Sequence, residues 1–339
     1  VVAYYNFNPI LFNKLNFGFK KTDRYRSKFL IESVNDLQIE LDKLNISLII
    51  DSCSNGQNLI ESIKKLNVKE IFVRREWTRD EINEENEVLN KIDGSVKVNY
   101  SFDQFLYHPN DLKKKTEDIP DVFTLFRKKC EKDLKVRSLV KSPIKLDSKN
   151  RLAEEYKIPS LNDLGFNDFK VDKRSAFPFK GGTKSGIERI NSYFWKTKKL
   201  SYYKHTRNGL IGVDYSSKLS SWLANGSISP KMIYWETKKY EKQVIKNQST
   251  YWMVFELIWR DYFKYISMKY RDKIFSIEGI LNRKYNWDNS KNKVFEWIDG
   301  KTKEPFVNSN MLEIKNTGWM SNRGRQNVAS YFAKELELD

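Results

Sequence analysis

Short apolar runs alternate with helical patterns at the start of the chain, and this alternation limits the fold more than any other feature. Strand-like runs lie at residues 1–5, 47–50, 70–73 and 96–100, and helical patterns lie at 22–44, 58–66 and 79–90. Strands that are separated by helices usually pair in parallel, because the helix carries the chain back along the sheet. The sequence therefore predicts an α/β N-terminal domain with a parallel sheet over residues 1–105.

The regular spacing of apolar residues is lost between residues 106 and 180, where prolines and charged residues interrupt the chain. From residue 181 onwards the pattern is helical throughout. Helices are predicted at residues 187–196, 220–225, 230–240, 249–268, 291–298, 309–315 and 321–336. We expect a long connector over residues 106–180 and an all-α C-terminal domain over residues 181–339.

The charge balance bears on the partner. A formal net charge of +17 favours an anionic partner, most simply nucleic acid, and an ordinary lysine-rich surface is the alternative. The two cysteines and two histidines match no metal, disulfide or serine–histidine pattern, so no metal is expected. No run approaches the roughly 18 apolar residues of a membrane span. We expect a soluble intracellular monomer, in the cytoplasm of a bacterium or in an organelle or the nucleus of a eukaryote.

The segment 214–230, "DYSSKLSSWLANGSISP", places serines and a lysine just ahead of a predicted helix. Free backbone N–H groups at a helix start, with hydroxyl groups and an ammonium nearby, suit a phosphate or a diphosphate. Plain helix capping by the serines is the alternative interpretation.

The segment 249–265, "STYWMVFELIWRDYFKY", carries an unusual stripe. Trp252, Glu256, Trp259 and Arg260 have the spacing that puts them on one face of a helix. Aromatic rings that can stack and charged groups that can orient a ligand suit a cavity for a planar molecule. The alternative is an internal ion pair between Glu256 and Arg260 within an aromatic core.

The segment 316–339 places polar residues at the head of an apolar-striped helix. Arg325 suits a phosphate, whereas the amides of Asn322 and Gln326 suit a polar ring edge. Gly324 allows another backbone or a ligand to approach closely. These residues predict a helix end that faces a polar aromatic ligand and a phosphodiester.

With these segments in view, the chain resembles the photolyase/cryptochrome family, and specifically its cryptochrome DASH branch. Similar segments follow in family order along the whole chain, among them "VRREWTRDE", "LYHPNDL", "IPDVFTLFRKKCEK" and "NRGRQN". The resemblance implies an antenna domain, a connector and a helical FAD-binding domain. It also implies a carbon–carbon lyase in which excited reduced flavin passes an electron to a cyclobutane pyrimidine dimer, preferentially in single-stranded DNA.

The resemblance assigns roles to residues by matching position. It implies DNA contacts by Arg323, Arg325 and Gln326, with Asn322 near both flavin and lesion. Glu256 and Trp259 match the pair that meets the dimer, and Trp287 matches the outermost tryptophan of an electron-transfer chain. The positions implied to hold FAD are Tyr203, Ser216, Ser217, Leu219, Ser220, Trp252, Arg260 and Asn322. Glu76 matches a carboxylate that binds the antenna 5,10-methenyltetrahydrofolate, and a solvated glutamate at a helix start is the alternative.

The chain also departs from the family pattern. Compared with the family it lacks the first strand and the last part of the helical domain, so the resemblance implies an incomplete photolyase-like fold. That last part carries acidic residues beside the flavin ring and two inner tryptophans. Asn308 replaces an aspartate, and Trp319 stands where phenylalanine is more usual. Two alternatives to repair therefore remain, a blue-light photoreceptor or nucleic-acid-binding regulator without turnover, and an inactive remnant.

Overall fold

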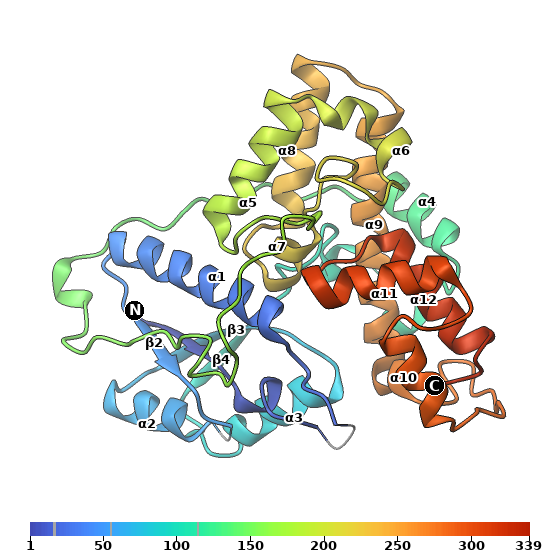
Figure 1. Cartoon of the computed structure of the whole chain (residues 1–339). Coiled ribbons are helices and arrows are strands. Elements are labelled where there is room, and N and C mark those ends of the chain that lie inside the picture. The colour runs from blue at the N-terminus through green and yellow to red at the C-terminus, as the bar shows by residue number, and fades with distance from the viewer. Residues whose placement is uncertain (16–17, 55, 114) are drawn as a thin grey trace.

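The computed structural model describes residues 1–15, 18–54, 56–113 and 115–339. An N-terminal α/β half and a C-terminal helical half lie against each other, joined by a long connector (Figure 1). The four strands are β1 (Ala3–Asn6), β2 (Leu48–Asp51), β3 (Glu70–Arg74) and β4 (Lys97–Ser101). β1 pairs in parallel with β2, and β3 pairs in parallel with β4. The parallel pairing is confirmed, but the described strands form two two-stranded sheets and not the single sheet that the sequence predicts.

The helices of this half are α1 (Arg24–Lys43), α2 (Gln57–Lys65) and α3 (Arg79–Leu89). The Asp23 side chain caps α1 by accepting a hydrogen bond from the N–H of Arg24. Val34 on α1 is buried with Phe7, Phe12 and Leu48. Connector residues complete this core, because Leu161 and Phe166 are buried in the same cluster.

The connector is more ordered than the sequence predicts. It contains a helix, α4 (Phe123–Asp133), where no helical pattern is evident from the sequence. Phe123, Phe126 and Cys130 are buried in the core of the helical half, and α4 packs against α9. These apolar residues keep helical spacing within a charged stretch only 11 residues long. So short a pattern does not stand out in the sequence. The connector therefore contributes buried residues to the core of the helical half.

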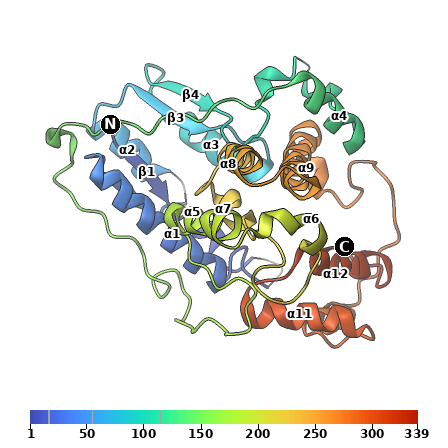
Figure 2. The same cartoon turned by 90° about the horizontal axis from the view of Figure 1, so that it is seen from above.

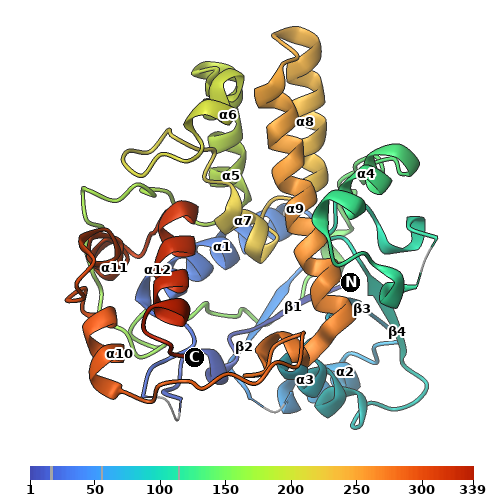
Figure 3. The same cartoon turned by 90° about the vertical axis from the view of Figure 1, so that its right-hand side faces the viewer.

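The helical half is built around α9, the longest helix of the described chain. Its helices are α5 (Thr183–Ile190), α6 (Tyr203–Thr206), α7 (Ser220–Asn225), α8 (Pro230–Gln243), α9 (Gln248–Tyr270), α10 (Lys291–Ile298), α11 (Pro305–Thr317) and α12 (Asn322–Lys334). A π-helical segment, Asn191–Lys196, continues α5. Figures 2 and 3 show α8 and α9 side by side, with α11 and α12 gathered on another side. The prediction of an all-α C-terminal half is confirmed.

A buried carboxylate fastens the connector to α9. Asp261 is completely buried, and its Oδ2 accepts hydrogen bonds from the N–H groups of Leu106 at 2.9 Å and Tyr107 at 2.8 Å. The Tyr265 hydroxyl, one turn further along α9, donates to the carbonyl oxygen of Tyr107 at 2.6 Å. Burial raises the pKa of Asp261 to about 7, against the pull of the two N–H groups and Arg260.

Substitution of Asp261 should separate the effect of the hydrogen bonds from the effect of the charge. Asp261→Ala leaves two buried N–H groups without an acceptor and should lower the free energy of unfolding by about 3 kcal/mol. Asp261→Asn keeps one oxygen at the Oδ2 position, which both N–H groups already share, and loses only the second contact of the Leu106 N–H, with Oδ1 at 3.0 Å. We therefore expect the asparagine variant to be far more stable than the alanine variant in urea unfolding.

The pH dependence of stability follows from the raised pKa of Asp261. A raised folded-state pKa contributes stability that is fully present below the unfolded value of 3.8 and is lost as the pH rises through about 7. Wild-type protein should lose stability relative to Asp261→Asn across this window. A constant difference between the two proteins from acid to neutral pH would contradict this assignment.

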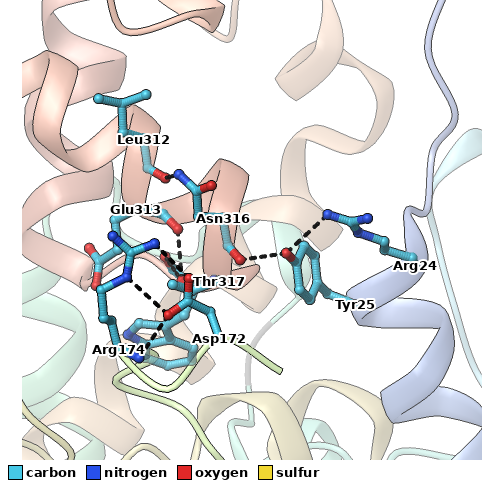
Figure 4. A network of polar contacts seen from close by, with 9 residues as sticks. Arg24, Tyr25, Asp172, Arg174, Leu312, Glu313, Asn316 and Thr317 are labelled. Atoms are coloured by element: carbon cyan, nitrogen blue, oxygen red, sulfur yellow. Dashed lines mark hydrogen bonds and ion pairs between the residues drawn. The ribbon is translucent and has the colours of Figure 1, made fainter. Parts of the chain in front are cut away.

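The start of α12 is held by a junction between distant parts of the chain (Figure 4). The Tyr25 hydroxyl on α1 donates to the carbonyl oxygen of Asn316, at the end of α11, at 2.6 Å. Gly318 follows with a φ of +69°, and a Cβ atom there would lie 2.2 Å from the Tyr25 ring. Asp172 and Arg174 of the connector form an ion pair in the same region. The Tyr25 hydrogen bond and the close approach at Gly318 fix the turn between α11 and α12 against the N-terminal half.

Candidate flavin and DNA site

The predicted stripe of Trp252, Glu256, Trp259 and Arg260 lies on α9, and its two charged residues have partners outside the stripe. Glu256 forms an ion pair with Arg207 at 2.8 Å, and the Arg207 guanidinium lies over the Trp252 ring at 4.6 Å. Arg260 instead donates to the backbone carbonyls of Gln104 at 2.6 Å and Leu223 at 3.1 Å. The alternative of an internal pair between Glu256 and Arg260 is therefore wrong. Sequence analysis did not identify Arg207, because nothing in its local pattern points to α9.

Burial is the largest influence on the pKa values of Glu256 and its neighbour Tyr203. It raises the pKa of Glu256, and Arg207 acts in the opposite direction. Tyr203, at the start of α6, is buried beside this group, and both burial and the Glu256 carboxylate raise its pKa. The structure thus brings together Tyr203, Trp252 and Glu256, which the sequence predicts as site residues from two separate segments.

The indole of Trp259 is already stacked. The Phe123 ring lies parallel to it, with centroids 3.4 Å apart and an interplanar angle of 9°. Phe263 lies beside it at 5.5 Å and 25°. A base that stacks on Trp259 would thus have to share the indole with connector residue Phe123.

Arg260 connects the end of the N-terminal domain to α7. Its two backbone contacts use two of the five N–H donors of a guanidinium, so further donors remain for a ligand. Burial lowers the pKa of Arg260. The observed contacts give this residue a bracing role, and contact with flavin stays a prediction.

The loop that bears the predicted phosphate-binding serines is organised by Arg189, a buried residue of α5. Its Nε donates to the Ser217 carbonyl at 2.9 Å and its Nη2 to the Ser216 carbonyl at 3.0 Å. Its Nη1 pairs with Asp214 at 2.8 Å. We call residues 213–220 the serine loop. Arg189 was not identified from the sequence, because a single arginine in a helical pattern carries no distinctive signal.

The serine loop contains a buried amine that suits an anion. Lys218 is 3% exposed, and its Nζ is without a hydrogen-bond partner in the described chain. Burial and the charge of Arg189 lower the pKa of Lys218 to about 7. Leu219 is buried beside it, Ser216 is half-buried, and Ser220 begins α7. A buried amine without a hydrogen-bond partner, in a loop that carries three serines, is a group that an anion such as the diphosphate of FAD would satisfy.

The predicted DNA-contacting residues lie at the exposed head of α12. The Ser321 hydroxyl caps the helix by accepting a hydrogen bond from the N–H of Gly324 at 2.9 Å. Arg323, Arg325 and Gln326 are exposed. Asn322, which is predicted to lie near both flavin and lesion, is exposed as well. A Cβ on Gly324 would lie 2.1 Å from Asn310 Oδ1, so the close approach is to α11. In the described chain, hydrogen bonds or ion pairs do not join these residues to the α9 stripe.

Two further predicted residues lie apart from this group. Glu76 follows β3 and pairs with Arg74 at 2.6 Å, and its role at an antenna stays a prediction. The neighbouring Trp77 donates its indole N–H to Ser267 on α9 at 2.9 Å. Trp287 is half-buried, and its ring contacts Tyr285 at 5.3 Å.

Comparisons with known proteins agree with this arrangement. The family model described as DNA photolyase matches residues 1–145, and the model described as FAD binding domain of DNA photolyase matches residues 252–339. The chain is 38% identical to a cryptochrome DASH of Synechocystis, over the whole chain and 69% of that relative. The chain belongs to the photolyase/cryptochrome family. It lies among the cryptochrome DASH proteins and contains sequence of the family's FAD-binding domain.

Other cryptochrome DASH relatives extend the match. The chain is 40% identical to the Xenopus laevis protein and covers 66% of it. It is 38% identical to the chloroplastic/mitochondrial protein of Arabidopsis thaliana and covers 60% of it. The chain therefore spans about two thirds of the length of the curated cryptochrome DASH proteins that it matches.

Solved structures show the same fold. The Synechocystis cryptochrome crystal structure matches the whole chain with a TM-score of 0.93 at 38% identity, over 70% of its own length. A bacterial class III photolyase from Agrobacterium tumefaciens matches with a TM-score of 0.77 at 20% identity, over 68% of its length. The photolyase-like fold predicted from the sequence is confirmed.

None of the described helices is long and apolar enough to cross a membrane. Among residues 1–15, 18–54, 56–113 and 115–339, no group of acidic, histidine and cysteine side chains could hold a metal ion.

Proposed function

We propose that this protein binds FAD and uses blue light to split cyclobutane pyrimidine dimers, preferentially in single-stranded DNA. The observation that carries this proposal is the half-buried Glu256 carboxylate, which pairs with Arg207 at 2.8 Å beside the ring of Trp252 and raises the pKa of the buried Tyr203. Similarity to cryptochrome DASH proteins and to the photolyase FAD-binding domain supports it.

The cofactor would be held mainly by the serine loop. Its serine hydroxyls and the Lys218 ammonium would bind the diphosphate. Arg189 fixes the conformation of the loop through hydrogen bonds to the backbone carbonyls of Ser216 and Ser217. Tyr203, Trp252, Arg260 and Asn322 would contact the rest of the molecule. Bound and reduced, FAD would supply the light-absorbing electron donor.

The protein's own groups would bind and orient the DNA. The Glu256 carboxyl would hydrogen-bond a pyrimidine edge, and the Trp259 indole would stack on the dimer. Arg323, Arg325 and Gln326 at the α12 head would contact phosphates and base edges. A dimer is easier to extrude from a single strand than from a duplex, which supports the single-strand preference.

An antenna is a further part of the proposal. Glu76 would bind 5,10-methenyltetrahydrofolate near the contact between Trp77 and α9. Trp287 would serve as the outermost tryptophan of an electron-transfer chain that leads to the flavin. We propose that the protein works as a monomer.

The direct test is the visible spectrum of the purified protein with added FAD, before and after blue illumination with a reductant. A bound flavin band that bleaches is expected, followed by light-dependent loss of dimers from single-stranded DNA. A bleaching flavin without dimer loss would favour a blue-light receptor or regulator. Failure to bind FAD at all would overturn the proposal.

A further inference from the structure

Lys218 connects two parts of the candidate site that are far apart in the sequence. Its Nζ lies 3.1 Å from the centre of the Tyr215 ring in the serine loop and 5.0 Å from the centre of the Trp319 ring. The Trp319 indole N–H also lies 3.4 Å from the Tyr215 hydroxyl. An ammonium is attracted to aromatic faces, and more strongly so when water is excluded. A neutral amine loses most of this attraction.

The surroundings of this amine leave its charge finely balanced. Arg189 on α5 opposes the charge, whereas Glu313 on α11 and Asp214 in the serine loop favour it. None of these groups forms a hydrogen bond or ion pair with the Lys218 Nζ in the described chain. Lys218 also has a φ of +63°, a conformation that a non-glycine residue rarely adopts. The backbone is thus held in an unfavourable conformation while the side chain is buried between the two rings.

Trp319 in turn fixes the start of α12. Its ring stacks on Phe177 of the connector, with centroids 4.7 Å apart and an angle of 7°. The next residue, Met320, accepts a hydrogen bond from the Arg325 Nε at 3.3 Å, and Ser321 caps the helix. Displacement of Trp319 would therefore move the α12 head.

We propose that the Lys218 ammonium is a latch between the serine loop and the α12 head, and that an anion bound at the serine loop closes this latch by keeping the amine protonated. Lys218 is then a positioning residue for the residues that face DNA. The second half of the proposal rests on the proposed function, since the anion is the diphosphate of FAD. Cofactor occupancy would regulate how well ordered the DNA-contacting surface is.

The latch is tested by hydrogen exchange of the backbone amides of Trp319, Gly324 and Arg325, in the dark, at pH 6 and pH 8. These amides donate to the Thr317 hydroxyl, the Ser321 hydroxyl and the Ser321 carbonyl. After correction for the intrinsic rate, wild-type amides should open about tenfold more often at pH 8, because an amine with a pKa of about 7 is then largely neutral. Lys218→Arg should stay protected at both pH values. Lys218→Met should exchange quickly at both.

Two further variants keep the test specific. Trp319→Leu removes the second ring and should resemble Lys218→Met at pH 6. Lys239→Met is the matched control, since the Lys239 ammonium also lies over an indole, at 5.1 Å from the Trp195 ring, but outside the candidate site. It should behave as wild type. Wild-type protection in Lys218→Met at pH 6, or an unchanged pH response in Lys218→Arg, would overturn the latch.

Added FAD separates this inference from the proposed function. FAD should restore protection of the Trp319, Gly324 and Arg325 amides at pH 8 in wild type but not in Lys218→Met. If FAD binds, as judged by its spectrum, and protection does not change, the proposed coupling between FAD binding and the order of the α12 head is wrong. The proposed function would not be affected by this result. If FAD does not bind, the proposed function and the coupling both fail, whereas the variants without FAD still decide the latch.

Discussion

Replacement of Arg189 by methionine is expected to lower the free energy of unfolding by about 3 kcal/mol or more, because it removes a buried cation and leaves its acceptors unpaired. The guanidinium is 4% exposed and donates to Asp214 and to the carbonyls of Ser216 and Ser217. It is also placed against the rings of Phe179 at 4.9 Å and Tyr193 at 4.8 Å. FAD affinity should fall with stability, because the serine loop loses the group that shapes it.

The measurement is urea unfolding together with FAD titration. Arg174→Met is the matched control, because Arg174 pairs with Asp172 but its side chain is 76% exposed. Exposed pairs contribute at most about 1 kcal/mol, so this control should be nearly neutral. Arg189→Lys should be intermediate, since one ammonium cannot reach all the acceptors. Equal stability of Arg189→Met and Arg174→Met would show that the loop keeps its shape without Arg189.

The second large effect is expected from Glu256→Ala, which should reduce light-dependent dimer splitting in single-stranded DNA by at least about tenfold, the equivalent of one lost hydrogen bond to a charged group. The variant also leaves Arg207 without its partner at 2.8 Å. Arg207→Met separates the two causes, because it removes the pair but keeps the carboxyl. We expect Arg207→Met to retain more activity than Glu256→Ala.

Glu40→Ala provides the control for loss of a glutamate. Glu40 lies on α1, pairs with Lys43 at 2.6 Å and has a side chain that is 53% exposed. Flavin absorbance of each variant should be recorded first, so that loss of cofactor is not mistaken for loss of chemistry. Undiminished dimer splitting by Glu256→Ala with its flavin bound would remove Glu256 from the proposed site.

The sequence predicts the elements of this fold well and their long-range contacts poorly. The predicted strand at residues 70–73 is observed as Glu70–Arg74, because a period of two residues is a local property. Helix α4 is not predicted, because its helical spacing covers only 11 residues of a charged stretch, and its packing against α9 cannot be read from the local sequence.

The same distinction applies to the candidate site. The stripe of α9 follows from helical spacing, and the structure places Trp252 and Glu256 together as expected. Their partner Arg207 is 49 residues from Glu256 in sequence. A sequence without aligned relatives cannot show such a pairing. The buried position of Lys218 and the bracing contacts of Arg260 likewise depend on the tertiary structure.

The contact between Trp77 and Ser267 has a consequence for energy transfer. The proposed antenna residue Glu76 adjoins this contact, and the same helix, α9, carries Trp252 and Arg260 of the proposed flavin site. The separation of the two chromophores would then be set by the rise of a single helix, about 1.5 Å per residue. Because dipole coupling depends steeply on distance, the yield of excitation at the flavin would depend on α9 and on the two loops that carry Glu76 and the flavin-binding serines.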